Sequence, residues 1–167
     1  VESFEIIEQA PHDLVVAHLP GARSPLQGPH RWHVLIELAG PPALLEELLG
    51  AAIGAGDAED AVVAQSVTQA EALWALREGI PEAERRDGKS VKSDISVAVA
   101  DVAAFHEAAV AMVRAHFPTA RPLVFGHLGD GNLHWNIRPP ESNHPGPLPR
   151  NRSPDGCCSI MHVLPRP

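Results

Sequence analysis

The chain has 167 residues, of which 44% are apolar and 20% charged, a composition typical of a globular protein with an ordinary hydrophobic core. No apolar stretch approaches the ~20 residues that a membrane-spanning helix needs, which excludes a protein with helical membrane spans. Thirteen basic against 21 acidic side chains give a formal net charge of −8, which argues against a nucleic-acid partner.

The composition changes near residue 140. Eight of the 17 prolines and both cysteines lie in the last 29 residues, from Pro139 to Pro167. We therefore predict a folded domain over residues 1–140 and a proline-rich, irregular tail over 141–167 that contributes little. The domain has no cysteine and its start lacks the pattern of a secretory signal, which favours a reducing, cytoplasmic location. The chain also begins without Met, so we expect it to be a piece of a longer protein.

Strand-like and helix-like patterns alternate along residues 1–140. In chain order, we predict a strand at 4–7, a helix at 11–19, a strand at 32–38, a helix at 42–54, a strand at 61–64, a helix at 68–78, a strand at 94–99, a helix at 102–116, and strands at 122–126 and 133–137. The helix at 68–78 is expected to open with a capping box formed by Thr68 and Glu71.

This alternation, which closes on a hairpin, predicts an α+β fold. We expect a mainly antiparallel sheet with helices packed on one face, in ferredoxin-like layers, followed by the irregular tail. A doubly wound parallel sheet is the alternative, although the chain lacks the glycine-rich strand-to-helix turn of a dinucleotide site.

The most informative segment runs from His127 to Asn136. Its Asp130-Gly131 pair is typical of a two-residue type I′ hairpin turn. A reversal there places His127 opposite His134, with Cβ atoms ~5 Å apart, and puts Asn136 on the same face. Two imidazoles at that separation can bind one metal ion, but zinc sites usually have three or four protein ligands, and the sequence does not identify a third. The alternative is a pair of histidines that share a face without binding a metal.

A second candidate site lies in a basic segment. Half of the ten basic residues in 1–140 fall within 16 positions, namely Arg77, Arg85, Arg86, Lys89 and Lys92. Interleaved acidic residues favour a solvated surface for most of them. Arg77 is the exception, because it follows Trp74 by one turn, and a guanidinium flanked by an aromatic ring is suited to bidentate binding of a carboxylate.

Three segments, taken together, resemble the C-terminal domain of the FAD-linked oxidases. The matching strings are Leu73–Glu78 (LWALRE), Lys92–Val97 (KSDISV) and Gly126–His134 (GHLGDGNLH), of which the last is highly specific. The family includes enzymes of the D-2-hydroxyglutarate dehydrogenase, D-lactate dehydrogenase and FAD-containing glycolate oxidase type. The resemblance covers about residues 1–140.

The resemblance implies a substrate-binding cap domain set over a flavin. Enzymes of this family oxidise a small D-2-hydroxy acid to the 2-oxo acid, with hydride passing from C2 to FAD. By motif position, His127 and His134 match ligands of a divalent metal, zinc or manganese, which polarises the substrate hydroxyl. Arg77 and Lys92 match positions that hold substrate carboxylates, and Asn136 matches a substrate-contacting amide. No residue is assigned as catalytic.

The chain also departs from the family pattern. The family's later Ser-x-Glu-His-Gly stretch supplies a third metal ligand and the catalytic base, and no Glu-His or His-Gly pair occurs here. Pro81 stands where 2-hydroxyglutarate-type members tend to have a hydroxyl residue, so the substrate is not identified. Because the match stops after Pro140, we expect the tail to be an out-of-frame or truncated readout.

We therefore interpret the chain as a fragment of an FAD-dependent D-2-hydroxy-acid dehydrogenase or oxidase. FAD would be bound mainly by a domain that the chain lacks, so the isolated fragment is expected to bind no flavin and to show no turnover. The electron acceptor is not identified, and a homodimer is the oligomeric state to test. The alternatives are a stand-alone module that binds a small anion or a metal, and an inactive product of a degraded gene.

Overall fold

The computed structural model describes residues 1–139 and the strand at 158–163. The strands are β1 (Ser3–Glu8), β2 (Trp32–Glu37), β3 (Ala58–Val63), β4 (Asp94–Ser96), β5 (Arg121–His127), β6 (Asn132–Arg138) and β7 (Cys158–Val163). The α-helices are α1 (Gln9–His18), α2 (Pro42–Ala55), α3 (Val67–Glu78), α4 (Ile80–Asp87) and α5 (Val102–His116), and the single 3₁₀ turns are η1 (Val99–Asp101) and η2 (Leu128–Asp130). No helix of this part of the chain is both long and apolar enough to cross a membrane.

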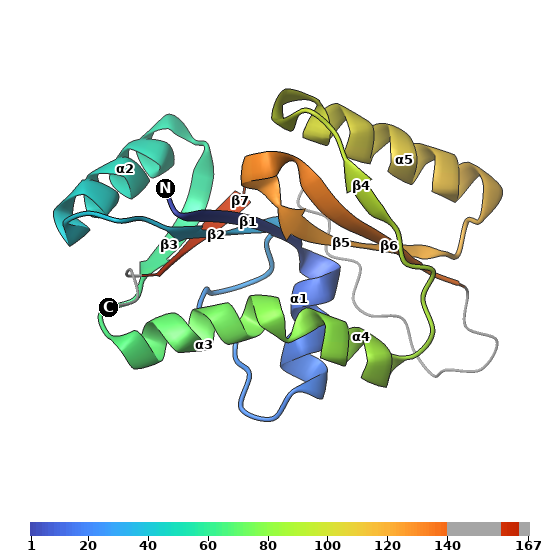
Figure 1. The fold of residues 1–167 in the computed structure, drawn as a ribbon, viewed down its shortest axis with the longest axis horizontal. Coiled ribbons are helices and arrows are strands. Elements are labelled where there is room, and N and C mark those ends of the chain that lie inside the picture. Colours follow the sequence, from blue (N-terminus) through green and yellow to red (C-terminus); the bar gives the residue numbers. More distant parts are fainter. Residues whose placement is uncertain (140–157, 164–167) are drawn as a thin grey trace.

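One sheet organises the molecule, with strand order β3-β7-β2-β1-β5-β6-β4 (Figure 1). The β1–β2, β1–β5, β5–β6 and β4–β6 pairs are antiparallel, whereas β7 is parallel to both β2 and β3. The predicted α+β class with a mainly antiparallel sheet is therefore confirmed. The doubly wound alternative is excluded because the central pairings are antiparallel.

Helices cover both faces of this sheet, so the expectation of helices on one face was wrong (Figure 1). The core shared by α1, α3 and α4 includes Ile7 and Leu123, while the cores under α2 and α5 include Val34 and Val124. Neighbouring residues of one strand point to opposite faces, so β5, with Leu123 and Val124 both buried, needs cover on each side. We call the two sides the α3 face and the α5 face.

The tail contains more structure than expected. Residues 140–157 and 164–167 lie outside the described residues, but Cys158–Val163 form β7, which pairs with β2 on one side and β3 on the other. The prolines that dominate the composition of the tail flank this short stretch, and its pattern contains β-branched Ile160 and Val163. Composition averaged over the tail therefore concealed a strand.

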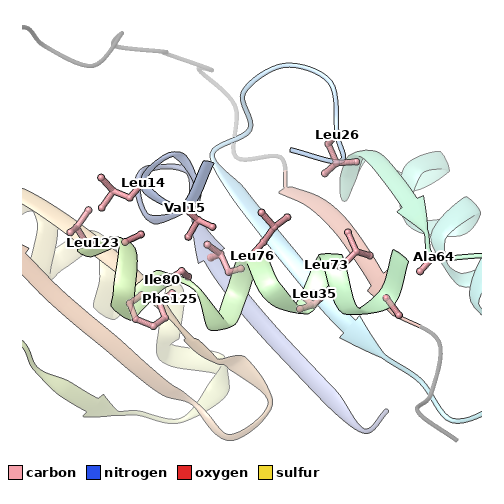
Figure 2. Packing of buried hydrophobic residues seen from close by; sticks show 13 residues of the cluster. Leu14, Val15, Leu26, Leu35, Ala64, Leu73, Leu76, Ile80, Leu123 and Phe125 are labelled. Carbon is pink, nitrogen blue, oxygen red and sulfur yellow. The ribbon is translucent and has the colours of Figure 1, made fainter. Parts of the chain in front are cut away.

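The core of the α3 face fixes the helices that carry the basic segment (Figure 2). Val15, Leu35 and Ile80 are each fully buried there, from α1, β2 and α4. Gly79 joins α3 to α4 with helical dihedrals, so that the two helices follow each other directly. A Cβ at Gly79 would lie 2.3 Å from a methyl of Leu19, so the close packing of α1 requires glycine at this junction.

Helix α3 begins earlier than its predicted cap. Ser66, not Thr68, is the N-cap, and its hydroxyl accepts a hydrogen bond from the Gln69 amide at 3.3 Å. A cap residue needs an extended backbone, which Ser66 has at φ −152° and ψ 159°. Thr68 already lies inside the first turn.

Candidate functional site

The β5–β6 hairpin brings His127 and His134 to the α3 face, but in a different register from the one predicted. His134 lies opposite Phe125, and His127 lies opposite Asn132, so the predicted direct pairing of the histidines was wrong. The loop is longer than a type I′ turn, because η2 precedes Gly131 and only Gly131 has a left-handed backbone, at φ 70°. A register difference of two residues preserves the face, so the histidine rings remain neighbours, 6.4 Å apart.

Each of the two histidines is held by a carboxylate. Glu5 of β1 contacts Nδ1 of His127, and Asp94 of β4 lies 2.6 Å from Nδ1 of His134. A carboxylate at Nδ1 favours the proton on that nitrogen and leaves the Nε2 lone pair for a ligand. The two rings are 53% and 33% exposed, so Nε2 is accessible in each.

Arg77 of α3 joins the same group of residues through Glu5. Its Nε donates to the second oxygen of the Glu5 carboxylate at 2.7 Å, and its guanidinium carbon lies 4.8 Å from the centre of the Phe125 ring. The expected aromatic neighbour is therefore Phe125 of β5 rather than Trp74. The terminal nitrogens of Arg77 make no hydrogen bond to any described residue, although the residue is only 8% exposed.

Lys92 and Asn136 meet at a second buried carboxylate, that of Glu84. The Asn136 amide nitrogen lies 2.9 Å and 3.1 Å from the two Glu84 oxygens, and the Lys92 ammonium donates to one of them at 3.2 Å. The Asn136 oxygen accepts a hydrogen bond from the Ser93 backbone. Glu84 is 1% exposed and Asn136 2% exposed, whereas Lys92 is half-exposed and its ammonium reaches solvent.

A cleft of about 450 Å³ opens beside this second group. Of the predicted site residues only Lys92 lines it, together with Glu84, Arg85 and Lys89. Its basic lining suits an anionic ligand. The histidine pair, Arg77 and Asn136 lie outside this lining.

The other basic residues of the segment behave as a solvated surface. Arg85 and Arg86 both form ion pairs with Glu82 on the exposed side of α4. Surface pairs of this kind contribute little to stability. The prediction that most of the basic segment is solvated, with Arg77 as the exception, agrees with the exposed positions of Arg85 and Arg86.

Sequence reasoning missed the acidic partners that hold these side chains. Glu5 and Glu84 are each 1% exposed, and Asp94 pairs with His134 across β4 and β6. One signal was available for Glu5, because it is a single charge inside the apolar stretch Phe4–Ile7. Glu84 sits among other charged residues of α4, and nothing in the sequence distinguishes it from them.

The described residues offer a metal at most two neighbouring imidazoles, those of His127 and His134. Among residues 1–139, no group of three or more His, Cys, Asp and Glu side chains could hold a metal ion. His127 and His134 nevertheless show the carboxylate-supported imidazoles that are typical of metal ligands. A complete site therefore needs at least one ligand from elsewhere.

Comparison with known proteins identifies the family of the chain. Residues 1–146 match the family model described as FAD linked oxidases, C-terminal domain. The chain belongs to this family. The resemblance drawn from the three sequence strings is therefore confirmed, and with it membership of a flavin-dependent oxidoreductase family.

The relatives are D-2-hydroxyglutarate dehydrogenases. The chain is 35% identical over 149 residues to the mitochondrial enzyme of Arabidopsis thaliana, an alignment covering 86% of this chain and 26% of the relative. It is 36% identical over 146 residues to the enzyme of Xanthomonas citri pv. viticola, with coverage of 85% and 30%. It is 31% identical over 149 residues to the mitochondrial enzyme of Danio rerio, with coverage of 86% and 27%. The chain thus spans less than a third of each of these relatives.

Proposed function

We propose that this chain is the substrate-binding part of an FAD-dependent enzyme that oxidises a small D-2-hydroxy acid to the 2-oxo acid. The observation that carries the proposal is that five predicted site residues share the α3 face. Glu5 and Glu84, both buried, hold four of them, namely Arg77, Lys92, Asn136 and His127, while exposed Asp94 holds His134. D-2-hydroxyglutarate, the substrate named for the relatives, carries two carboxylates and a hydroxyl, and is the first ligand to test.

Arg77 and Lys92 are the proposed carboxylate-binding residues. The fixed fork of Arg77 is suited to a planar carboxylate, and the exposed ammonium of Lys92 provides a second charge at the cleft. Asn136 is proposed as a third contact. Because its amide is bonded to Glu84 and Ser93, a contact with the substrate requires one of these hydrogen bonds to be released.

His127 and His134 are proposed as two ligands of a divalent metal, zinc or manganese. When bound, the metal would polarise the substrate hydroxyl and a carboxylate oxygen, while FAD would accept the hydride. The chain's own part is to present two imidazoles whose Nδ1 atoms are held by Glu5 and Asp94. No described residue is assigned as the base that removes the hydroxyl proton.

Binding of D-2-hydroxyglutarate to this chain, followed by calorimetry, tests the proposal without a flavin. Arg77→Ala and Lys92→Ala should each weaken binding about tenfold or more, because each removes a charge-assisted contact. Arg23→Ala removes an equal charge from an exposed position and should leave the affinity unchanged. Binding that is absent, or equally affected in all three variants, would contradict the assignment.

Titration with Zn²⁺ or Mn²⁺ tests the metal proposal separately. His127→Ala and His134→Ala should each weaken binding, whereas His116→Ala, an exposed histidine of α5, should not. The isolated chain should show no flavin absorption band and no turnover. A yellow protein would contradict the proposal that another part of a longer protein holds FAD.

A stand-alone module that binds a small anion or a metal is the second candidate. The cleft beside Lys92 and the accessible Nε2 atoms of the histidines favour it, since neither feature requires a flavin. An adjoining coding sequence for an FAD domain would support the enzyme, whereas a lone gene with tight zinc binding would support the module.

The cytoplasmic location and the homodimer stay predictions, to be checked by cell fractionation and size-exclusion chromatography.

A further inference from the structure

A second cleft, of about 350 Å³, lies on the α5 face, on the opposite side of the sheet from the candidate site. It is bounded by the end of β1, the residue before β2, and α5, which contribute Glu8, Arg31, His106 and Arg114. Its volume falls in the range of small-molecule sites. None of the residues proposed for the α3 face lines it.

Two guanidinium groups meet in this cleft without a protein partner. The guanidinium groups of Arg31 and Arg114 form no hydrogen bond or close ion pair with any described residue, yet both act electrostatically on Glu8 and on His106. Both arginines line the same cleft. Like charges gathered in this way favour an anion between them.

Two buried polar atoms of the cleft also lack a hydrogen-bond partner. His106 is 4% exposed, its Nδ1 has no partner, and one oxygen of the Glu8 carboxylate is likewise unpaired. Nε2 of His106 lies 3.9 Å from the other Glu8 oxygen. The Trp32 and His106 rings pack edge to face, with their centres 4.8 Å apart. Buried polar atoms are nearly always paired, so the Nδ1 atom of His106 is left to bond a molecule in the cleft.

The protonation states leave the cleft cationic near neutral pH. Burial raises the pKa of Glu8 to about 7 even though Arg31 and Arg114 lower it. Burial, together with the same two arginines, lowers the pKa of His106 to about 4, so its ring is neutral. Glu8 is then only partly ionised and Glu107 is the other acid in the lining, against two full positive charges.

We propose that this cleft binds a small oxyanion, a carboxylate or a phosphate, between Arg31 and Arg114, with the Nδ1–H of His106 as a further donor. Both anions present oxygens that a guanidinium binds in bidentate fashion. The proposal does not depend on the function assigned to the α3 face.

Calorimetric titration with inorganic phosphate and, separately, with acetate tests the proposal. Arg31→Ala and Arg114→Ala should each weaken binding about tenfold or more, because each removes one charge-assisted contact. Arg23→Ala serves as the control and should leave it unchanged, since Arg23 is exposed and does not line the cleft. Binding of one anion and not the other identifies the ligand class. No binding of either anion, or an equal loss in Arg23→Ala and Arg114→Ala, would overturn the proposal.

The pH dependence of binding provides a second readout. Ionised Glu8 repels an anion, so the affinity for acetate should fall as the pH rises through about 7. Acetate is the probe for this readout because phosphate gains a second negative charge in the same range. Arg31, Arg114 and Glu107 also face the cleft, and His106 is neutral over this range. Glu8→Gln should remove this fall. An identical pH profile in the variant would show that the anion does not lie beside Glu8.

Discussion

Two buried glutamates determine the geometry of the proposed site at the level of single residues. Glu5 holds His127 and Arg77 with its two oxygens, and Glu84 holds Asn136 and, more weakly, Lys92. A buried carboxylate is costly unless its oxygens are paired, so each glutamate and the side chains that it contacts support one another.

Glu84→Ala should lower the free energy of unfolding by about 1–3 kcal/mol, because the buried Asn136 amide loses its acceptors. Lys92→Ala is the matched control. Its ammonium is solvated, so losing the same ion pair should cost about 1 kcal/mol or less. Urea unfolding measures both, and a larger loss for the lysine variant would refute this explanation.

Glu5→Gln should weaken zinc binding about tenfold, because a carboxylate on Nδ1 orients the imidazole and makes it a better ligand. Asp94→Asn should have a smaller effect, since Asp94 is largely exposed to water. Zinc titration of the two variants against the parent chain measures the difference. Equal affinities in all three proteins would argue against His127 as a ligand.

A buried histidine pair should make the fold sensitive to acid. His33 stacks on His12 with ring centres 4.2 Å apart, and burial with His12 and His30 lowers the pKa of His33 to about 3. The unfolded chain then binds the extra proton, so this contribution destabilises the protein as the pH falls from about 6.5 towards 3.

His33→Gln should reduce this loss of stability, and His116→Gln, at an exposed position, should not. Unfolding free energies at pH 5, 6 and 7 measure it as the difference between variant and parent. The comparison with the parent is needed because the raised pKa of Glu8 has the opposite effect. It increases the free energy of unfolding as the pH falls from about 7 to 4.5, whereas His33 decreases it. Parallel curves for the two variants would contradict the role of His33.

At the level of elements, the junction between α3 and α4 positions the site residues that these helices contribute to the α3 face. Arg77 lies two residues before Gly79 and Glu84 five residues after it, so the direction of both helices sets where the two side chains meet the sheet. The junction is tight because α1 packs against it, as the contact of Gly79 with Leu19 shows.

Gly79→Ala should destabilise the protein by about 1–3 kcal/mol, since the added Cβ would overlap Leu19 and the Ala75 carbonyl oxygen. Gly50→Ala in α2 is the control. It has open space around it and should stabilise the protein by up to about 1 kcal/mol through helix propensity. Thermal unfolding should therefore move in opposite directions in the two variants.

For the molecule as a whole, the tail strand completes the sheet. Among the strands that the structure describes, β3 pairs only with β7, so β3 is joined to the rest of the sheet through residues far along the chain. Ending the chain after Pro140 should remove hydrogen-exchange protection from β3 and from the β7-facing edge of β2, while β5 and β6 retain theirs. Unchanged protection in β3 would show that the tail does not hold this edge.

The amino-acid sequence alone determined most of the elements, although not α4 or β7, and it determined the shared face of the histidine pair. Hydrophobic periodicity is a local property, and a register error of two residues leaves His127 and His134 on the same side of the hairpin. The assignment of Arg77 and Lys92 to the site from the family strings stays a prediction.

Only the tertiary structure decided which carboxylates hold these side chains and how the layers are arranged. Glu5 lies 122 positions from His127 and 72 from Arg77, separations across which no local pattern specifies a contact. The same holds for the pairing of β7 with β2 and β3 and for the helices on both faces. These features depend on which distant surfaces of the folded chain are buried against one another. Local preferences for helix or strand do not specify that packing.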